Sequence, residues 1–204
     1  MLLKNILFIT CFGLLVSFNM KYNLETDKIL VETFNDEELN DIIKLIDYVD
    51  KLVKAETKSD DVKTAYPLYF EKLKINMFEG NYIVPINRET KCSIFERINE
   101  NTFDEFWYLQ CANMNKISSM ETSRTELSIN INGKYVDYIR KIGEADPLFQ
   151  DLYEFIMSTG HILSASMMIF LASNEGVDFN LIKNRLLAVV CIFSISEPIE
   201  KRED

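Results

Sequence analysis

The chain has 204 residues and a formal net charge of −10 at pH 7, with 48% hydrophobic and 26% charged residues. This length and mixture are typical of one globular domain that buries its core without structural disulfides or metals. The negative charge argues against a nucleic-acid partner, because phosphate backbones would be repelled. The low content of glycine (6) and proline (4) disfavours the many tight turns of a sandwich or barrel.

Residues 1–18 resemble a secretory signal peptide. Lys4 precedes an apolar run over residues 6–18, and Ser17 is a small residue suited to a cleavage site. As a helix, residues 2–18 would reach about 25 Å, which is short of the roughly 30 Å hydrocarbon core of a bilayer. We therefore expect cleavage and a secreted or cell-envelope protein, most of all a periplasmic one. The alternatives are a retained helix and a disfavoured lipid anchor on Cys11, so any membrane contact would use the leader or that lipid.

Helical patterning begins after an expected linker over residues 19–34. Asn35 and Glu38 have the spacing of a capping box, which predicts a helix over residues 36–56. Its apolar residues recur every three or four positions and so share one face. They are Leu39, Ile42, Ile43, Ile46, Val49, Leu52 and Val53. We expect a single helical domain over residues 35–197 and a solvated tail over residues 198–204.

Three further helices are predicted before residue 112. The second helix has Pro67 in its first turn and ends near Gly80. A short third helix lies around residues 94–98. The spacing of Thr102 and Glu105 predicts a capping box for a fourth helix, which would run through residues 103–111. A long polar loop follows over residues 113–124.

Residues 125–140 carry two conflicting patterns. Apolar residues alternate from Leu127 to Ile131, and Asn132 followed by Gly133 is typical of a hairpin turn. Apolar residues at positions 135, 138, 139 and 142 instead have helical spacing. We favour a helix and keep a hairpin as the alternative.

The remaining sequence predicts three helices and places one of them at the centre. Asp146 and Pro147 favour a helix start, and Gly160 favours its end. An apolar helix follows over residues 162–172, and Asp178 would cap a last helix over residues 179–195. The second half of that helix is apolar on every face, which is typical of a buried element. We predict an all-α fold, an irregular bundle of six to seven short-to-medium helices around one core.

Motifs for known cofactors and metals are lacking in the sequence. The four cysteines, at positions 11, 92, 111 and 191, form no C-x-x-C pair, and their spacing does not favour any bridge. His161 is the single histidine, whereas imidazole metal sites need more than one or carboxylates in register. No glycine-rich phosphate loop or hydrolase signature is present. We expect neither a cofactor nor a metal.

Four residues are the candidates for ligand binding. Trp107 and Tyr108 could line a groove for a ligand or peptide, although core packing is the alternative that we favour. Glu105 lies beside aromatic residues that could raise its pKa for acid catalysis, although its place in a capping box explains it more simply. His161 is a candidate for a nucleophile system, although a surface or half-buried histidine is the alternative that we favour.

The function we favour is that of a non-catalytic binding module, secreted or associated with the envelope, which acts on an unknown protein or small-molecule partner. One alternative is an acidic inhibitor or immunity-type protein that neutralises a basic enzyme. A second alternative is a carboxylate-dependent hydrolase with its site near Glu105 or His161.

Overall fold

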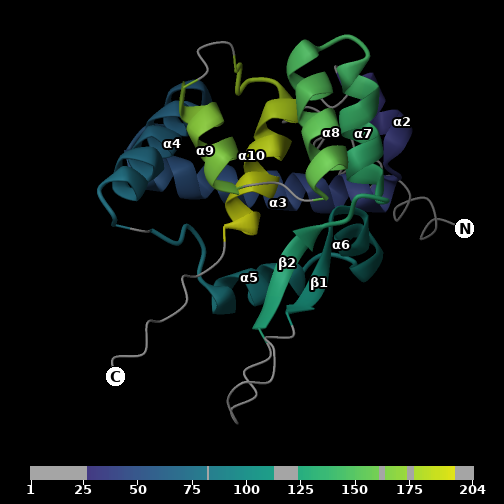
Figure 1. Cartoon of the computed structure of the whole chain (residues 1–204), viewed down its shortest axis with the longest axis horizontal. Helices are drawn as coiled ribbons and strands as arrows, with labels where there is room; N and C mark the ends of the chain where they lie inside the picture. The colour runs from purple at the N-terminus through teal and green to yellow at the C-terminus, as the bar shows by residue number, and fades with distance from the viewer. Residues whose placement is uncertain (1–26, 82, 113–123, 161–163, 174–176, 196–204) are drawn as a thin grey trace, which may run out of the picture.

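The protein has the predicted all-α fold, with one small two-stranded sheet beside the helices (Figure 1). The computed structural model describes residues 27–81, 83–112, 124–160, 164–173 and 177–195. These residues form nine helices, more than the six to seven expected. The helices are α2 (Lys28–Thr33), α3 (Asp36–Thr57), α4 (Val62–Phe78), α5 (Arg88–Phe95), α6 (Glu100–Phe106), α7 (Lys134–Gly143), α8 (Pro147–Thr159), α9 (Ser164–Ser173) and α10 (Ile182–Ser194). The leader and the tail lie outside the described residues.

The long helix α3 confirms the sequence prediction for its start. The Asn35 side chain accepts a hydrogen bond from the backbone N–H of Glu38, and the Glu38 carboxylate accepts one from the Asn35 N–H. This reciprocal capping satisfies two backbone donors at the helix end. The apolar face of α3 is buried, with Ile42, Ile46 and Val49 fully inaccessible to solvent.

The range expected as a linker contains helix α2. The Asp27 side chain caps this helix by accepting from the backbone N–H of Leu30 at 3.0 Å. Leu30 is fully buried and Phe34 is 3% exposed, so both side chains belong to the core. Six residues are too few to show a clear period, which explains why the sequence pattern missed this helix.

Helix α4 begins earlier than predicted. Its N-cap is Asp61, whose side chain accepts from the Thr64 N–H, so Pro67 lies inside the helix rather than in its first turn. A proline inside a helix removes one backbone hydrogen bond. The buried aromatic residues Tyr66, Tyr69 and Phe70 hold this helix in the core in spite of that loss.

The predicted fourth helix is wrong at both ends. Its N-cap is Asn99, because the Thr102 hydroxyl donates to Asp41 of α3 instead of capping its own helix. The Asp41 carboxylate also accepts from the Asn99 N–H at 2.7 Å. Helix α6 ends at Phe106, and strand β1 (Trp107–Ala112) follows with an extended backbone at Trp107.

The alternation and the helical spacing in residues 125–140 each hold over their own part, whereas the hairpin turn considered at Asn132 and Gly133 does not form. Strand β2 (Arg124–Ile129) pairs antiparallel with β1, with Trp107 opposite Ile129. Helix α7 then carries the four residues of helical spacing, and all four are buried. Gly133 is the N-cap of α7, so the Asn132–Gly133 pair joins a strand to a helix rather than closing a two-residue hairpin.

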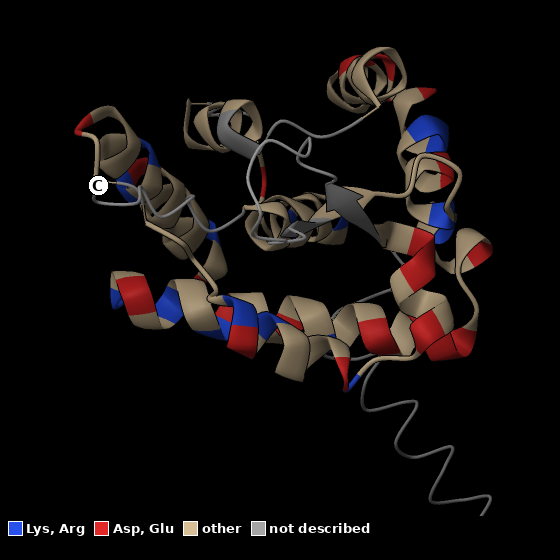
Figure 2. Ribbon diagram, turned by 60° about the horizontal axis from the view of Figure 1, so that its bottom comes forward, with Lys and Arg blue, Asp and Glu red and all other residues tan. Residues whose placement is uncertain are grey.

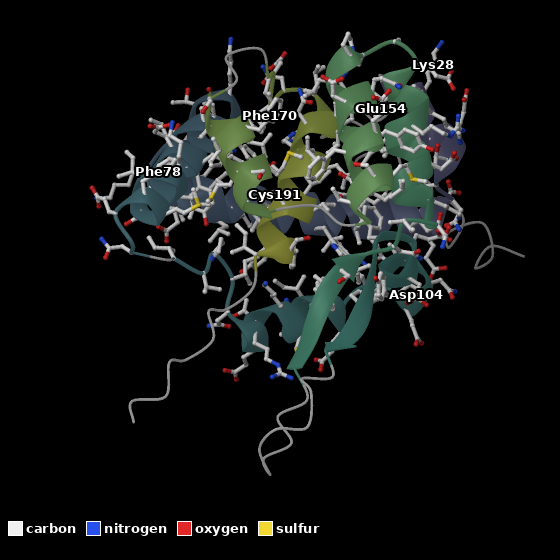
Figure 3. The ribbon with its side chains drawn as sticks, viewed as in Figure 1. Lys28, Phe78, Asp104, Glu154, Phe170 and Cys191 are labelled. Atoms are coloured by element: carbon white, nitrogen blue, oxygen red, sulfur yellow. The ribbon has the colours of Figure 1, made fainter. Side chains whose placement is uncertain are left out.

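Helix α10 lies at the centre of the bundle, as its apolar second half predicts. It passes between α9 and α8 in front of α3, and Cys191 lies within the core (Figures 1 and 3). Every residue from Leu186 to Phe193 is buried. The helix begins at Ile182, later than predicted, because Asp178 accepts from Asn180 in a turn before it. The start of α8 at Pro147, capped by Asp146, and its end at the left-handed Gly160 are confirmed.

Within the described part of the chain, every helix is too short or too polar to cross a bilayer.

Candidate functional site

Trp107 is a core residue and lines no surface groove. Its side chain is fully buried and its ring lies 5.1 Å from that of Phe106, 5.4 Å from that of Phe95 and 6.0 Å from that of Phe193. Such clusters of aromatic rings stabilise a core beyond the area they bury. The core-packing alternative for Trp107 is therefore the one that the structure supports.

The other aromatic candidate is separated from Trp107 by the alternation of the strand. Tyr108 is 43% exposed, whereas its neighbour Trp107 is inside, because successive side chains of a strand point to opposite faces. His161 lies outside the described residues. The structure thus does not bring the predicted aromatic pair together in one site.

Glu105 stabilises the start of helix α7. Its carboxylate accepts a hydrogen bond from the backbone N–H of Lys134, the first residue of α7, at 2.8 Å. The Lys134 ammonium binds the buried Glu38 carboxylate at 2.6 Å and lies 3.8 Å from Glu105. A carboxylate at a helix N-terminus is favoured by the unpaired N–H groups and by the helix dipole. Glu105 therefore has a structural role at α7, not at the start of its own helix as the spacing suggested.

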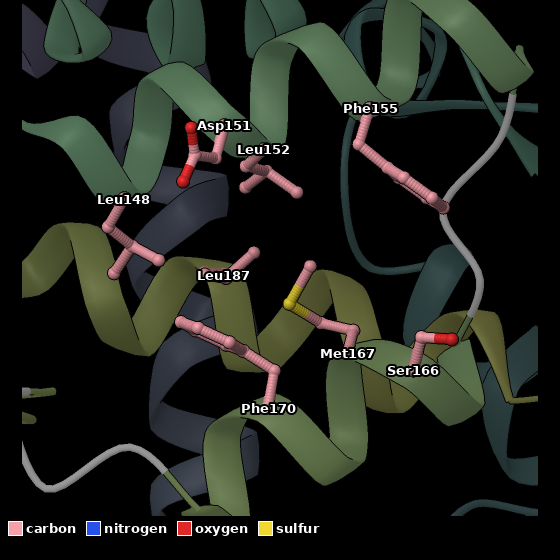
Figure 4. A pocket seen from close by; sticks show the side chains of 8 residues that line it. All are labelled: Leu148, Asp151, Leu152, Phe155, Ser166, Met167, Phe170 and Leu187. Atoms are coloured by element: carbon pink, nitrogen blue, oxygen red, sulfur yellow. The ribbon is translucent and has the colours of Figure 1, made fainter.

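A different part of the molecule contains a ligand-sized pocket. Its volume is about 300 Å³, and it lies between α8, α9 and α10 (Figure 4). Helix α8 contributes Leu148, Asp151, Leu152 and Phe155; α9 contributes Ser166, Met167 and Phe170; and α10 contributes Leu187. The lining is thus mainly apolar.

The pocket results from the way the three helices pack. Helix α8 packs chiefly against α7, whereas α9 packs against α4 and α10. The two helices therefore face each other across α10 without forming a close interface of their own (Figure 1). Leu187 of α10 is fully buried at the base of the space, and Phe155 and Phe170 are half-buried at its sides.

Polar groups lie at the two ends of this pocket and apolar groups lie between them. Figure 4 shows the Asp151 carboxylate near Leu148 at one end and the Ser166 hydroxyl below the Phe155 ring at the other. Leu152, Leu187 and Met167 occupy the middle. A ligand with an apolar body and a polar end matches this distribution.

A buried ionic cluster lies elsewhere, at the contact of α3, α4 and α10. The Asp50 carboxylate accepts hydrogen bonds from the Tyr66 hydroxyl at 2.8 Å and from the Arg185 guanidinium at 3.0 Å. Burial and the nearby Asp50 carboxylate raise the pKa of the Tyr66 hydroxyl well above its ordinary value. These groups neutralise one another inside the core, so their role is structural.

Charges on the surface are unevenly distributed. The first turn of α3 exposes Asp36 and Glu37, and the long helix in Figure 2 shows acidic residues at that end and mixed charges further along. In the described part of the chain, His, Cys, Asp and Glu form no group of three or more that could hold a metal ion. Cys92 is a free, exposed thiol, whereas the Cys191 side chain lies inside the core.

Sequence reasoning missed the pocket because its residues belong to separate helices. In the sequence, Leu148, Leu152 and Phe155 have the spacing of one buried helical face, which does not by itself indicate a pocket. One signal was available: α9, with the sequence SASMMIFLAS, has no charged residue although Met167 and Phe170 are only half-buried. A helix that is apolar all round yet partly exposed is unusual unless a ligand or partner covers it.

Comparison of the chain with protein-family models, with curated proteins and with solved structures finds no match in any of the three.

Proposed function

We propose that this protein is a non-catalytic binding protein that holds a small, largely apolar ligand in the pocket between α8, α9 and α10. The observation that carries the proposal is the pocket itself, about 300 Å³ in volume and lined by six apolar side chains of eight. Close-packed interiors contain few voids larger than a water molecule.

The size of the pocket agrees with this role. Ligand sites have volumes of roughly 300–1,000 Å³, so this one suits a small molecule such as a short alkyl chain or a single aromatic ring. An apolar cavity of about half this size already binds benzene. Binding would bury the exposed parts of Phe155, Met167 and Phe170, which favours association by the hydrophobic effect.

The chemistry of the lining favours binding over catalysis. General acid–base hydrolysis by carboxylates uses two such groups with separated pKa values. The described lining has one carboxylate, Asp151, and one hydroxyl, Ser166, at opposite ends of the pocket. Glu105, the carboxylate singled out from the sequence, is engaged by Lys134 at the start of α7.

We further propose that the protein acts outside the cytoplasm, after removal of its leader. The support is the apolar run over residues 6–18 behind Lys4. Mass analysis of the protein from the native envelope fraction would test this, with cleavage after Ser17 as the expected result. An intact N-terminus on protein recovered from the cytosol would contradict export.

The binding proposal is tested with a neutral apolar fluorescent dye, whose emission rises when it leaves water. We expect the dye to bind the wild-type chain at one site and the Met167→Trp variant much more weakly, because the larger side chain fills the pocket. The matched control is Ile75→Trp, since Ile75 lies on α4, is 46% exposed and does not line the pocket.

Circular dichroism of both variants verifies that the helices are retained. If Met167→Trp no longer folds, the variant Ser166→Phe takes its place in the comparison, because the larger side chain narrows the pocket at the end opposite Asp151. Equal dye binding by the wild type and the filled variant, with folding intact, would refute the proposed site.

A further inference from the structure

We propose that the ligand of this pocket is an amphipathic cation, an amine or quaternary ammonium with a short apolar body, whose charge is held by Asp151. The inference rests on the proposed function and specifies the chemical class of the ligand. It depends on the charges around the pocket.

Asp151 is the one charged side chain of the described lining. It lies on α8 at the end of the pocket near Leu148, and its carboxylate is exposed. It makes no hydrogen bond or ion pair with another described residue. Its charge is therefore free to meet a ligand group at the pocket opening.

The neighbouring charged groups are engaged elsewhere. On α10, one turn before Leu187, the Lys183 ammonium binds Asp146 at 2.6 Å and lies over the Phe149 ring. On α8, the exposed Glu154 carboxylate accepts a hydrogen bond from Gln150. Helix α9 carries no charge. Asp151 thus determines the sign of the charge at the pocket, and an anionic amphiphile such as a fatty acid would meet repulsion there.

The apolar part of the ligand has a defined place in this arrangement. From Asp151, the pocket continues between Leu152 and Met167 toward Phe155, the direction in which Figure 4 shows apolar side chains on both sides. A chain that begins at the carboxylate would follow that path. The hydrophobic effect would supply most of the affinity, and the carboxylate would supply selectivity for charge.

Three probes of equal chain length test the inference: octylammonium, octanol and octanoate, each titrated as a competitor of the neutral dye. At low salt, we expect octylammonium to bind about threefold to fivefold more tightly than octanol, and octanoate to bind more weakly than octanol. The modest ratio reflects the exposure of Asp151. It should shrink as salt is added, because ions screen exposed charges.

Two isosteric variants identify the source of the selectivity. Asp151→Asn should abolish the differences in affinity among the three probes and leave the affinity for octanol unchanged. Glu154→Gln, which neutralises an exposed carboxylate of the same helix outside the lining, should keep the order. Persistence of the preference in Asp151→Asn would overturn the inference and assign the effect to the overall negative field of the chain.

The outcomes separate this inference from the proposed function. Equal binding of the three probes by the wild type would leave the apolar pocket established and refute the cationic ligand class. Failure of the dye and of every probe to bind would refute the pocket as a ligand site and the inference with it.

Discussion

The guanidinium of Arg185 donates a hydrogen bond to the carboxylate of Asp50 at a distance of 3.0 Å, inside the protein. The two residues belong to α10 and α3, the central helix and the longest one. The Tyr66 hydroxyl of α4 donates to the other oxygen of the same carboxylate. One buried anion thus joins three helices, and this arrangement has a measurable consequence for stability.

Replacing Arg185 by methionine should lower the free energy of unfolding by about 3–5 kcal/mol, because the variant leaves the Asp50 charge buried without its cation. Urea denaturation of the wild type and the variant measures the difference. The double variant Asp50→Asn with Arg185→Met should lose much less than the sum of the two single variants, because it leaves no uncompensated charge. Additive losses would show that the pair is not coupled.

Replacing Tyr135 by phenylalanine should raise the free energy of unfolding by about 1 kcal/mol. The Tyr135 hydroxyl is buried and has no hydrogen-bond partner among the described residues, so the variant removes an unsatisfied polar group while it keeps the ring against Phe106. The matched control is Tyr66→Phe, which should be destabilising because that hydroxyl donates to Asp50. Urea denaturation measures both variants. A change of the free energy of unfolding in the same direction in both would contradict the prediction.

Stability should fall at alkaline pH. Burial raises the pKa of the Cys191 thiol from 9.0 to about 12 and raises the pKa of the Tyr135 hydroxyl above its ordinary 10.0. The unfolded chain loses these protons as the pH rises through 9.0 and 10.0, whereas the folded chain keeps them. The folded state then binds more protons, so the free energy of unfolding decreases with increasing pH.

Urea denaturation at a series of alkaline pH values measures this slope. The Tyr135→Phe variant should have a shallower slope than the wild type, because it lacks one of the groups that titrate only after unfolding. An unchanged stability across this range would contradict the burial of these groups.

Replacing Gly133 by alanine should destabilise the fold by about 1–3 kcal/mol through a steric clash. A Cβ at this position would lie 2.3 Å from the backbone oxygen of Glu105, and the backbone cannot move without displacing α6 from α7. Gly80→Ala provides the contrast: its Cβ would have open space, and its cost of about 1–2 kcal/mol would come from the left-handed backbone alone. Replacing each glycine by serine separates the steric clash from the backbone effect. Only at Gly133 should the loss of stability be larger for serine than for alanine.

The local signals in the sequence were sufficient where an element depends on its own residues. Asn35 with Glu38, and Asp146 with Pro147, determined two helix starts because their caps bind backbone groups within the next few residues. The apolar second half of α10 predicted a central helix from its own residues alone, because a helix that is apolar on every face is stable only when it is buried on every face.

The tertiary structure decided the features in which distant residues compete with local ones. Thr102 has the spacing of a cap, but its hydroxyl donates to Asp41 of another helix, so α6 starts elsewhere. Residues 107–112 could continue a helix by their composition, but pairing with residues 124–129 makes them a strand. Glu105 likewise stabilises α7 rather than its own helix.

By itself, the sequence determined that this chain folds into helices around an apolar core, because the periodicity of the side chains and the caps are local properties. The pocket was decided only by the tertiary structure. Leu148, Met167 and Leu187 come from three helices, and the space between them exists because α8 packs on α7 while α9 packs on α4. No local pattern in the sequence specifies which helices pack against each other, because that packing depends on how all the apolar faces of the chain fit together.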